Sequence, residues 1–249
     1  MLVSRLQICS ICGKIIMMEK LSGIKLKEGE VVEELFEGEL KIIQNTRFYR
    51  FTSDSVLLSR FVKAKAHERV ADFCAGSGIV GLHFFALNPE RVESVVLFEM
   101  QRELSEMSKR TVALNNLSNF TVKNCKVQEI GREYDDAFSL ILVNPPYETG
   151  GFDSDDYKKA VCRKEITITL SEIIEAAYRK LKFGGRLALV NRADRVAEVL
   201  FAMKARGIEP KRLQFVRGRA DAKPYLLLVE GAKGRKEGVD VLPDIVNTK

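Results

Sequence analysis

The 249-residue sequence lacks a long uninterrupted apolar run. The best candidate, residues 6–18, is broken by Lys14 and has no small-residue cleavage site, so we expect neither a membrane-spanning helix nor a signal peptide. There are only six prolines and no internal repeats, while 46% of the residues are hydrophobic and 30% are charged, which excludes a fibrous or disordered chain. The composition predicts a soluble globular protein that is long enough to fold without disulfide or metal support.

Cysteine and histidine are also scarce. The five cysteines are an odd number at scattered spacing: Cys9, Cys12, Cys74, Cys125 and Cys162. This usage favours the reducing cytoplasm over a disulfide framework. Cys9 and Cys12 form a C-x-x-C pair, but no second Cys or His pair follows at zinc spacing, so we predict no metal site. His67 lies in a charged loop and His83 in an expected helix, and we assign a catalytic role to neither.

Short β-rich runs alternate with amphipathic helical runs, which predicts an α/β protein with a mostly parallel sheet covered on both faces. The expected strands are residues 69–74, 94–100, 120–126, 138–143, 186–190, 213–216 and 225–229. The expected helices are residues 78–87, 102–115, 169–181 and 194–206, preceded by a hairpin at 39–51 and a helix at 53–63. Gly184 and Gly185 are expected to end a helix, the last two strands to form an antiparallel pair, and the tail after Gly234 to be loose.

A glycine-rich turn follows the first of these strands. Gly76, Gly78 and Gly81 allow a tight turn and a close approach of a ligand to the next helix. They also satisfy G-x-G-x-x-G, with Glu99 eighteen residues further on, so a nicotinamide or flavin cofactor has to be weighed. Asp72 favours S-adenosylmethionine instead, because a carboxylate suits its ammonium and sulfonium better than it suits a diphosphate. We expect Glu99 to accept hydrogen bonds from a ribose diol.

The segment Asn144-Pro145-Pro146-Tyr147 follows an apolar strand, at the sheet edge where open α/β folds place their chemistry. The Asn144 side-chain carbonyl and the Pro145 main-chain carbonyl can each accept one N–H of a planar NH2 group. The prolines hold both acceptors rigid, and the Tyr147 ring offers a face for stacking. Such a site would work by positioning and electrostatics rather than with a general base.

The formal net charge is +6, and residues 191–236 contain 12 Lys and Arg against 5 Asp and Glu. This excess is either a solvated surface or a footprint for phosphates. If it is a footprint, the expected contacts are Arg217, Arg219 and Lys223, together with Arg163 and Lys164.

From about residue 35 to residue 230 the sequence resembles the bacterial tRNA(Val) adenine-N6 methyltransferases that modify position 37, beside the anticodon. The matching stretches are residues 51–58, 72–81 and 144–147 and the Arg163-Lys164-Glu165 segment. The resemblance implies a Rossmann-like class I methyltransferase fold, with a seven-stranded, mostly parallel sheet and a C-terminal antiparallel strand. It also implies S-adenosylmethionine as cofactor, a tRNA substrate, Asp54 near the cofactor, and an RNA pocket shaped by residues 148–164.

Two positions depart from the family pattern: Cys74 replaces the first glycine of the cofactor turn, and Lys126 stands where related enzymes often carry an aspartate. The cofactor adenine would then be held by backbone and apolar contacts around Val127. The full expected cofactor set is Asp54, Asp72, Ala75, Gly76, Ser77, Gly78, Glu99, Met100, Val127 and Asn144.

We expect a methyltransferase domain at residues 33–233, an N-terminal extension at 1–32 and a tail at 234–249. Residues 1–16 match nothing in the family, so we expect translation to begin naturally at Met17 or Met18. The sequence implies no obligatory protein partner and leaves the oligomeric state open.

Three alternative functions remain. A protein glutamine methyltransferase would present the same NH2 geometry, but only about 65 residues precede the first sheet strand, too few for the domain that usually grips a release factor. A DNA adenine methyltransferase would use the same reactive corner. A catalytically inactive RNA-binding homologue would explain the departures at Cys74 and Lys126, although it would not explain why Asp72, Glu99 and the Asn144 segment are kept.

Overall fold

The computed structural model describes residues 24–36, 40–45, 53–145 and 168–248 of the chain. Within these ranges no helix is both long and apolar enough to cross a membrane. The C-x-x-C pair and the expected start at Met17 or Met18 lie outside the described residues.

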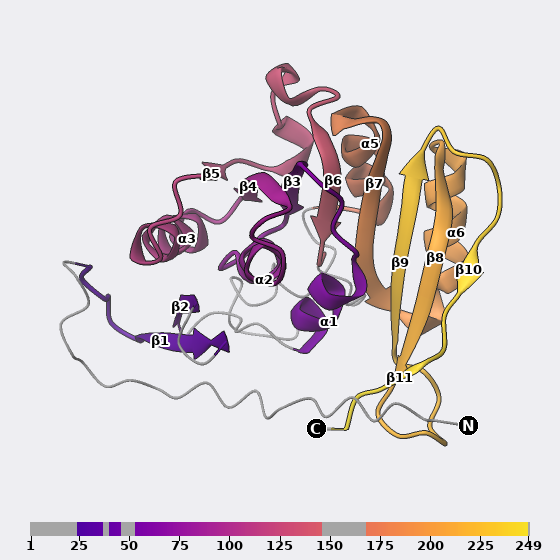
Figure 1. Cartoon of the computed structure of the whole chain (residues 1–249), viewed down its shortest axis with the longest axis horizontal. Coiled ribbons are helices and arrows are strands. Elements are labelled where there is room, and N and C mark those ends of the chain that lie inside the picture. The colour runs from indigo at the N-terminus through magenta and orange to yellow at the C-terminus, as the bar shows by residue number, and fades with distance from the viewer. Residues whose placement is uncertain (1–23, 37–39, 46–52, 146–167, 249) are drawn as a thin grey trace.

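The centre of the protein is a twisted sheet in which seven strands follow the expected arrangement (Figure 1). In spatial order they are β5 (Phe120–Asn124), β4 (Val92–Glu99), β3 (Glu68–Phe73), β6 (Phe138–Val143), β7 (Leu181–Arg192), β9 (Leu226–Lys233) and β8 (Ile208–Arg217). Neighbours from β5 to β7 are parallel, whereas β9 is antiparallel to both β7 and β8. The expected fold class is therefore confirmed.

The tail differs from the loose segment that the sequence predicts. Two short strands, β10 (Asp240–Val241) and β11 (Ile245–Val246), both pair in parallel with β8 and extend the sheet to nine strands. Leu242 N donates to Leu213 O at 2.8 Å, and Asn247 N donates to Arg217 O at 2.8 Å. An edge strand has unpaired backbone groups, and here the tail satisfies them.

The glycine pair at 184 and 185 also behaves differently from the expectation. Helix α5 (Leu170–Lys180) ends before it, and β7 has already begun when it is reached. The register of β7 against β6 shifts here, with Leu181 opposite Phe138 and Arg186 opposite Leu140. A Cβ atom on Gly185 would lie 2.8 Å from Lys182 O and 3.0 Å from Phe138 O. These glycines therefore permit an irregularity inside a strand rather than ending a helix.

Helices cover both faces of the sheet (Figure 1). The helices are α1 (Ser53–Phe61), α2 (Ile79–Leu87), α3 (Arg102–Leu114), α5 and α6 (Val196–Ala205), with short 3-10 turns η2 (Val127–Glu129), η3 (Arg132–Tyr134) and η4 (Ala193–Arg195). Alternate residues of β6 serve the two faces: Leu140 and Leu142 pack in the core under α1 and α2, whereas Ile141 and Val143 pack in the core under α5 and α6.

Capping fixes the start of α5. The Thr169 hydroxyl accepts from Glu172 N at 3.3 Å, and the Glu172 carboxylate accepts from Thr169 N at 2.8 Å. This reciprocal capping box satisfies two backbone donors that the helix itself leaves without partners. The helix therefore begins one residue after the position predicted from the sequence.

The N-terminal hairpin lies earlier in the chain than expected. Its strands are β1 (Glu30–Leu35) and β2 (Leu40–Asn45), whereas the sequence predicts residues 39–51, of which 46–51 lie outside the described residues. The hairpin docks on α3, because Ile43 N donates to Thr111 Oγ1 at 3.1 Å and Asn115 pairs with both backbone groups of Lys41. These bonds place the end of β2 beside the loop that follows β3.

Candidate active site at the carboxyl edge of the sheet

Three of the expected site residues come together at the carboxyl edge of the central strands. Asp72 lies near the end of β3, Glu99 ends β4, and Asn144 directly follows β6. Strand β3 pairs with β4 on one side and β6 on the other, so the strand order reverses at β3. Open α/β sheets bind their ligands at such a switch point.

The loop after β3 has an unusual backbone that is held from two sides. Cys74, Gly76 and Gly78 all have positive φ, at 56°, 57° and 85°. Gly76 N donates to Glu99 Oε2 at 2.8 Å, and Ser108 Oγ of α3 donates to Gly76 O at 2.9 Å. No atom lies within 4 Å of the position that a Gly76 Cβ would take, so this side of the loop is open.

Asp72 is almost completely enclosed, with 1% of its surface exposed. Its Oδ2 accepts from Gly81 N, in the first turns of α2, at 2.9 Å. Its Oδ1 is buried and has no hydrogen-bond partner among the described residues. Burial, assisted by the nearby charge of Glu99, raises the pKa of Asp72 from 3.8 to about 7.

Glu99 is 4% exposed, so it is not a surface glutamate. Besides Gly76 N, its carboxylate accepts from Gln101 N at 2.7 Å. Burial raises its pKa even though these backbone donors oppose the rise. Each carboxylate oxygen has room for a second hydrogen bond, so a ribose diol can still be accommodated.

These observations test whether S-adenosylmethionine fits the loop. Two buried carboxylates, one with an unpaired oxygen, favour a ligand that carries positive charge over one that carries a diphosphate. The open side at Gly76 leaves space for that ligand beside the backbone. The residues present therefore fit S-adenosylmethionine and do not fit a dinucleotide pyrophosphate.

The reactive corner is attached to α1. Asn144 Nδ2 donates to Ser55 Oγ in the first turn of α1 at 2.9 Å, although the two residues are 89 positions apart. Asp54 occupies the same helical turn, where Ser53 Oγ donates to its carboxylate at 3.3 Å. Pro145 is buried, whereas Pro146 and Tyr147 lie outside the described residues. The structure thus brings the Asp54 turn to Asn144, as the resemblance implies.

The structure adds polar residues that the sequence analysis missed. Gln44 Nε2, at the end of the hairpin, donates to Ser77 Oγ in the cofactor loop at 2.8 Å. Asn124, at the end of β5, donates to Glu99 O at 2.8 Å and to Met100 O at 3.0 Å. These residues support the loops from other elements, and no local sequence motif identifies them.

The expected adenine contact lies in a compatible environment. Val127 is buried and begins η2 directly after β5 and its loop. The preceding Lys126 has an exposed side chain that pairs with exposed Glu129 at 3.3 Å. Its ammonium is therefore engaged at the surface, which leaves apolar surroundings at Val127.

The expected phosphate contacts differ among themselves. Arg217 forms an ion pair with Asp244 of the tail and donates to Ala222 O at 2.6 Å, so its guanidinium is occupied within the protein. Arg219 is 79% exposed and only 3.7 Å from exposed Asp221, a pairing that contributes little. Lys223 is exposed in the same loop. Arg163 and Lys164 lie outside the described residues.

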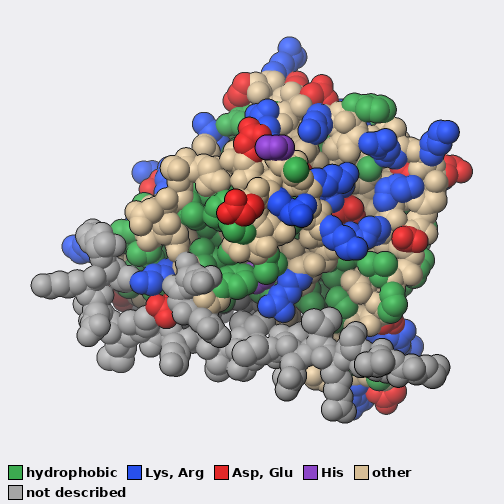
Figure 2. Space-filling view, viewed as in Figure 1, with side chains coloured by type: hydrophobic (Ala, Val, Ile, Leu, Met, Phe, Trp, Pro, Cys, Tyr) green, Lys and Arg blue, Asp and Glu red, His purple; other side chains and the backbone are tan. Residues whose placement is uncertain are grey.

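The loop with Arg219 and Lys223 lies on the correct edge of the sheet. Strands β7 and β8 are both antiparallel to β9, so the carboxyl end of β8 shares an edge with the carboxyl end of β7. Figure 2 also shows Lys and Arg side chains gathered over the part of the visible face where β7, β9 and β8 lie. A negatively charged ligand can therefore meet basic charge beside the candidate site.

Neither histidine belongs to this site. His83 is buried in α2, where its Nδ1 lies 2.7 Å from Ser59 Oγ, and burial lowers its pKa to about 4. It is therefore a neutral core residue. His67 is exposed in the turn before β3. In the part of the chain that the structure describes, no three His, Cys, Asp or Glu side chains are grouped to hold a metal.

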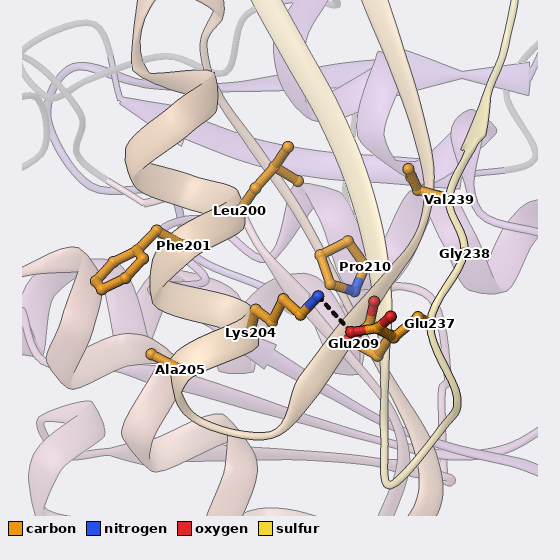
Figure 3. A pocket seen from close by; sticks show the side chains of 9 residues that line it. All are labelled: Leu200, Phe201, Lys204, Ala205, Glu209, Pro210, Glu237, Gly238 and Val239. Carbon is orange, nitrogen blue, oxygen red and sulfur yellow. Dashed lines mark hydrogen bonds and ion pairs between the residues drawn. The ribbon is translucent and has the colours of Figure 1, made fainter.

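One pocket lies elsewhere, between α6, β8 and the tail (Figure 3). Its volume is about 610 Å³, and the Lys204–Glu237 ion pair of 2.8 Å crosses it. It is lined by Leu200, Phe201, Lys204, Ala205, Glu209, Pro210, Glu237, Gly238 and Val239. None of the expected site residues lines it.

Comparison with known proteins gives the family. The family model described as "Methyltransferase small domain" matches residues 51–206, which include α1, the cofactor loop and Asn144. The chain belongs to this methyltransferase family. This result agrees with the resemblance inferred from the sequence.

Individual relatives are distant. A tRNA1(Val) (adenine(37)-N6)-methyltransferase from Shewanella sediminis is 26% identical over 151 residues, which are 59% of this chain and 61% of the relative. The chain thus spans less than two thirds of that protein.

Solved structures support the fold. A protein described as a predicted O-methyltransferase from Agrobacterium tumefaciens has a TM-score of 0.63 and 23% identity, covering 78% of this chain and 86% of its own. P. horikoshii TYW2, crystallised in complex with MeSAdo, has a TM-score of 0.59 and 14% identity, covering 84% and 73% respectively. At these identities the likeness shows the fold.

Proposed function

We propose that the chain transfers a methyl group from S-adenosylmethionine to the exocyclic N6 amine of an adenine in tRNA, with adenine 37 of tRNA(Val) as the target. The observation that carries the proposal is the attachment of Asn144 to Ser55, beside a loop with two buried carboxylates. An amide oxygen held at this edge is an acceptor for an NH2 group, and the loop is suited to a cationic cofactor.

The cofactor would be held by the loop residues and the strand ends. Asp72 Oδ1 would receive positive charge from the methionine part, and Glu99 would accept from the ribose. S-adenosylmethionine supplies the methyl group when bound. The remaining contacts we propose are those expected from the sequence: Asp54, Ala75, Gly76, Ser77, Gly78, Met100, Val127 and Asn144.

An exocyclic amine is a poor nucleophile, because its lone pair is delocalised into the ring. Asn144 Oδ1 and the Pro145 carbonyl would each accept one of its hydrogens and favour a more tetrahedral nitrogen. The pyrrolidine rings of Pro145 and Pro146 restrict the backbone, so the acceptors need little reorganisation during the reaction. No residue with a tuned pKa is needed as a base, consistent with a buried neutral His83.

The tRNA substrate is supported by the name of the Shewanella sediminis relative and by the position of Arg219 and Lys223. A stacked adenine cannot reach an acceptor at the end of a buried strand, so the base would be flipped out against Tyr147. A tRNA substrate, and the free cysteines Cys74 and Cys125, also fit a protein of the reducing cytoplasm.

The test is to incubate the protein with labelled S-adenosylmethionine and, separately, unmodified total tRNA, DNA and a release factor. We expect label in tRNA with the wild type and none with Asn144→Ala, which should bind the cofactor nearly as well. Label in DNA or in the protein would replace the substrate class. If wild-type protein binds the cofactor and labels no pool, the activity itself is refuted.

A further inference from the structure

The first turn of α1 contains a hydroxyl that the proposed reaction does not yet use. Ser55 is 2% exposed, and its Oγ accepts from Asn144 Nδ2 at 2.9 Å. Asn144 Oδ1 forms no hydrogen bond with any residue in the described part of the chain. One end of the Asn144 amide is therefore engaged and the other is available.

The two ends of an asparagine amide are nearly equal in size and opposite in function. The oxygen accepts hydrogen bonds and the NH2 group only donates them. A rotation of the side chain by half a turn would place two donors against the NH2 group of a target base, where they would repel it. Catalysis by Asn144 therefore requires that something in the protein selects one orientation of the amide.

We propose that Ser55 is the positioning residue that makes this selection: it engages the Asn144 NH2 group and so presents Oδ1 to the amine that is methylated. This inference rests on the proposed function and concerns a residue that lies outside the Asn-Pro-Pro-Tyr segment. Ser55 acts through Asn144 and touches neither the target base nor the methyl group.

Helix α1 is a rigid support for this bond. Leu57, Leu58 and Phe61 are buried in the core that α1 shares with α2. At the N-terminal end of the helix, Asn247 Nδ2 of the tail donates to Ser53 Oγ at 3.4 Å. A reacting group is held accurately only when its supporting residues are themselves fixed by packing, and Ser55 meets that condition.

The chain contains a matched control one helical turn further on. Ser59 is buried as deeply as Ser55, but its hydroxyl donates to Val56 O at 2.9 Å and lies 2.7 Å from His83 Nδ1, away from Asn144. Replacement of either serine by alanine removes one buried hydroxyl from the same helix. Only the Ser55→Ala change alters the environment of Asn144.

We expect Ser55→Ala to lower kcat by about 10- to 100-fold, somewhat less than the loss of a stabilising group outright. The cofactor Kd and the KM for tRNA should each stay within about threefold of wild type. Ser55→Thr, which keeps the hydroxyl, should recover most of kcat. Ser59→Ala should lower the unfolding temperature and leave kcat, counted per cofactor-binding protein, within about twofold of wild type.

A second measurement does not depend on activity. In ¹⁵N NMR spectra, hydrogen exchange of the Asn144 side-chain NH2 group should be slow in wild type and Ser59→Ala and faster in Ser55→Ala. Equal exchange in all three proteins, or equal kcat in wild type and Ser55→Ala, would overturn the inference. If the protected NH2 group is found in a wild type that methylates nothing, the proposed function fails while the bond itself stands.

Discussion

Replacing Asp72 by asparagine separates the folding of the cofactor loop from its charge. Asparagine keeps an oxygen that can accept from Gly81 N, so the bond to α2 is retained. It removes the negative charge that burial opposes in the cofactor-free protein. We therefore expect Asp72→Asn to be more stable than wild type above neutral pH, and to bind S-adenosylmethionine more weakly.

The magnitude follows from the pKa of Asp72. A rise from 3.8 to about 7 corresponds to about 4 kcal/mol in the free energy of unfolding, at about 1.4 kcal/mol per tenfold change in proton affinity. Because the folded-state pKa is raised, this stability is fully present below pH 3.8 and is lost as the pH rises through 7. Between pH 5 and pH 8, wild type should lose about 2–3 kcal/mol more than Asp72→Asn.

Urea denaturation of the cofactor-free proteins at pH 5 and pH 8 measures this difference. Asp221→Asn, which changes an exposed carboxylate, serves as control and should follow wild type. Calorimetry should show a loss of about 1.5–3 kcal/mol in cofactor binding by Asp72→Asn, the range for a hydrogen bond to a charged group. Parallel pH profiles for wild type and Asp72→Asn, or unchanged cofactor affinity, would refute the assignment of a buried charge that awaits a cation.

Three further predictions concern the loop and the RNA surface. Cys74→Gly should raise the free energy of unfolding by up to about 1 kcal/mol in urea, because a positive φ strains a residue with a side chain, and a clear loss would contradict this. Gly81→Ala should lower it by about 1–3 kcal/mol and weaken cofactor binding, since the new Cβ would lie 2.8 Å from Leu97 Cδ2; unchanged stability would count against the packing. Neutralising Arg219 and Lys223 should weaken binding to all tRNAs and flatten the salt dependence by somewhat under one unit of slope per contact, whereas an unchanged slope would mean a solvated surface.

The central strands could be predicted because their signal is local. The apolar run at residues 138–143 has polar neighbours at both ends, and the observed strand has these bounds. The glycine pair at 184–185 was misinterpreted, because glycine is common both after helices and at strand irregularities, and only the pairing of β7 with β6 distinguishes the two. The two-residue strands of the tail are too short to show periodicity, and they form because β8 offers an unpaired edge.

The same contrast applies to the site. Asp72, Glu99 and Asn144 stand at strand ends, and parallel topology brings such positions to one edge, so their proximity follows from the sequence. Ser55 is 89 residues from Asn144 and belongs to no recognisable polar motif, so its contact becomes visible only in the fold. The pairing of Arg217 with Asp244 is hidden for the same reason, because it depends on the path of the tail along β8.

The most direct test identifies the atom that receives the methyl group. Unmodified tRNA treated with the protein and S-adenosylmethionine would be digested to nucleosides and analysed by mass spectrometry against authentic standards. The account predicts N6-methyladenosine, located at position 37 of a valine tRNA and absent from the Asn144→Ala reaction. A methyl group on a ring nitrogen, on ribose or on cytosine would contradict the mechanism at Asn144, whereas N6-methyladenosine at another position would contradict only the choice of site.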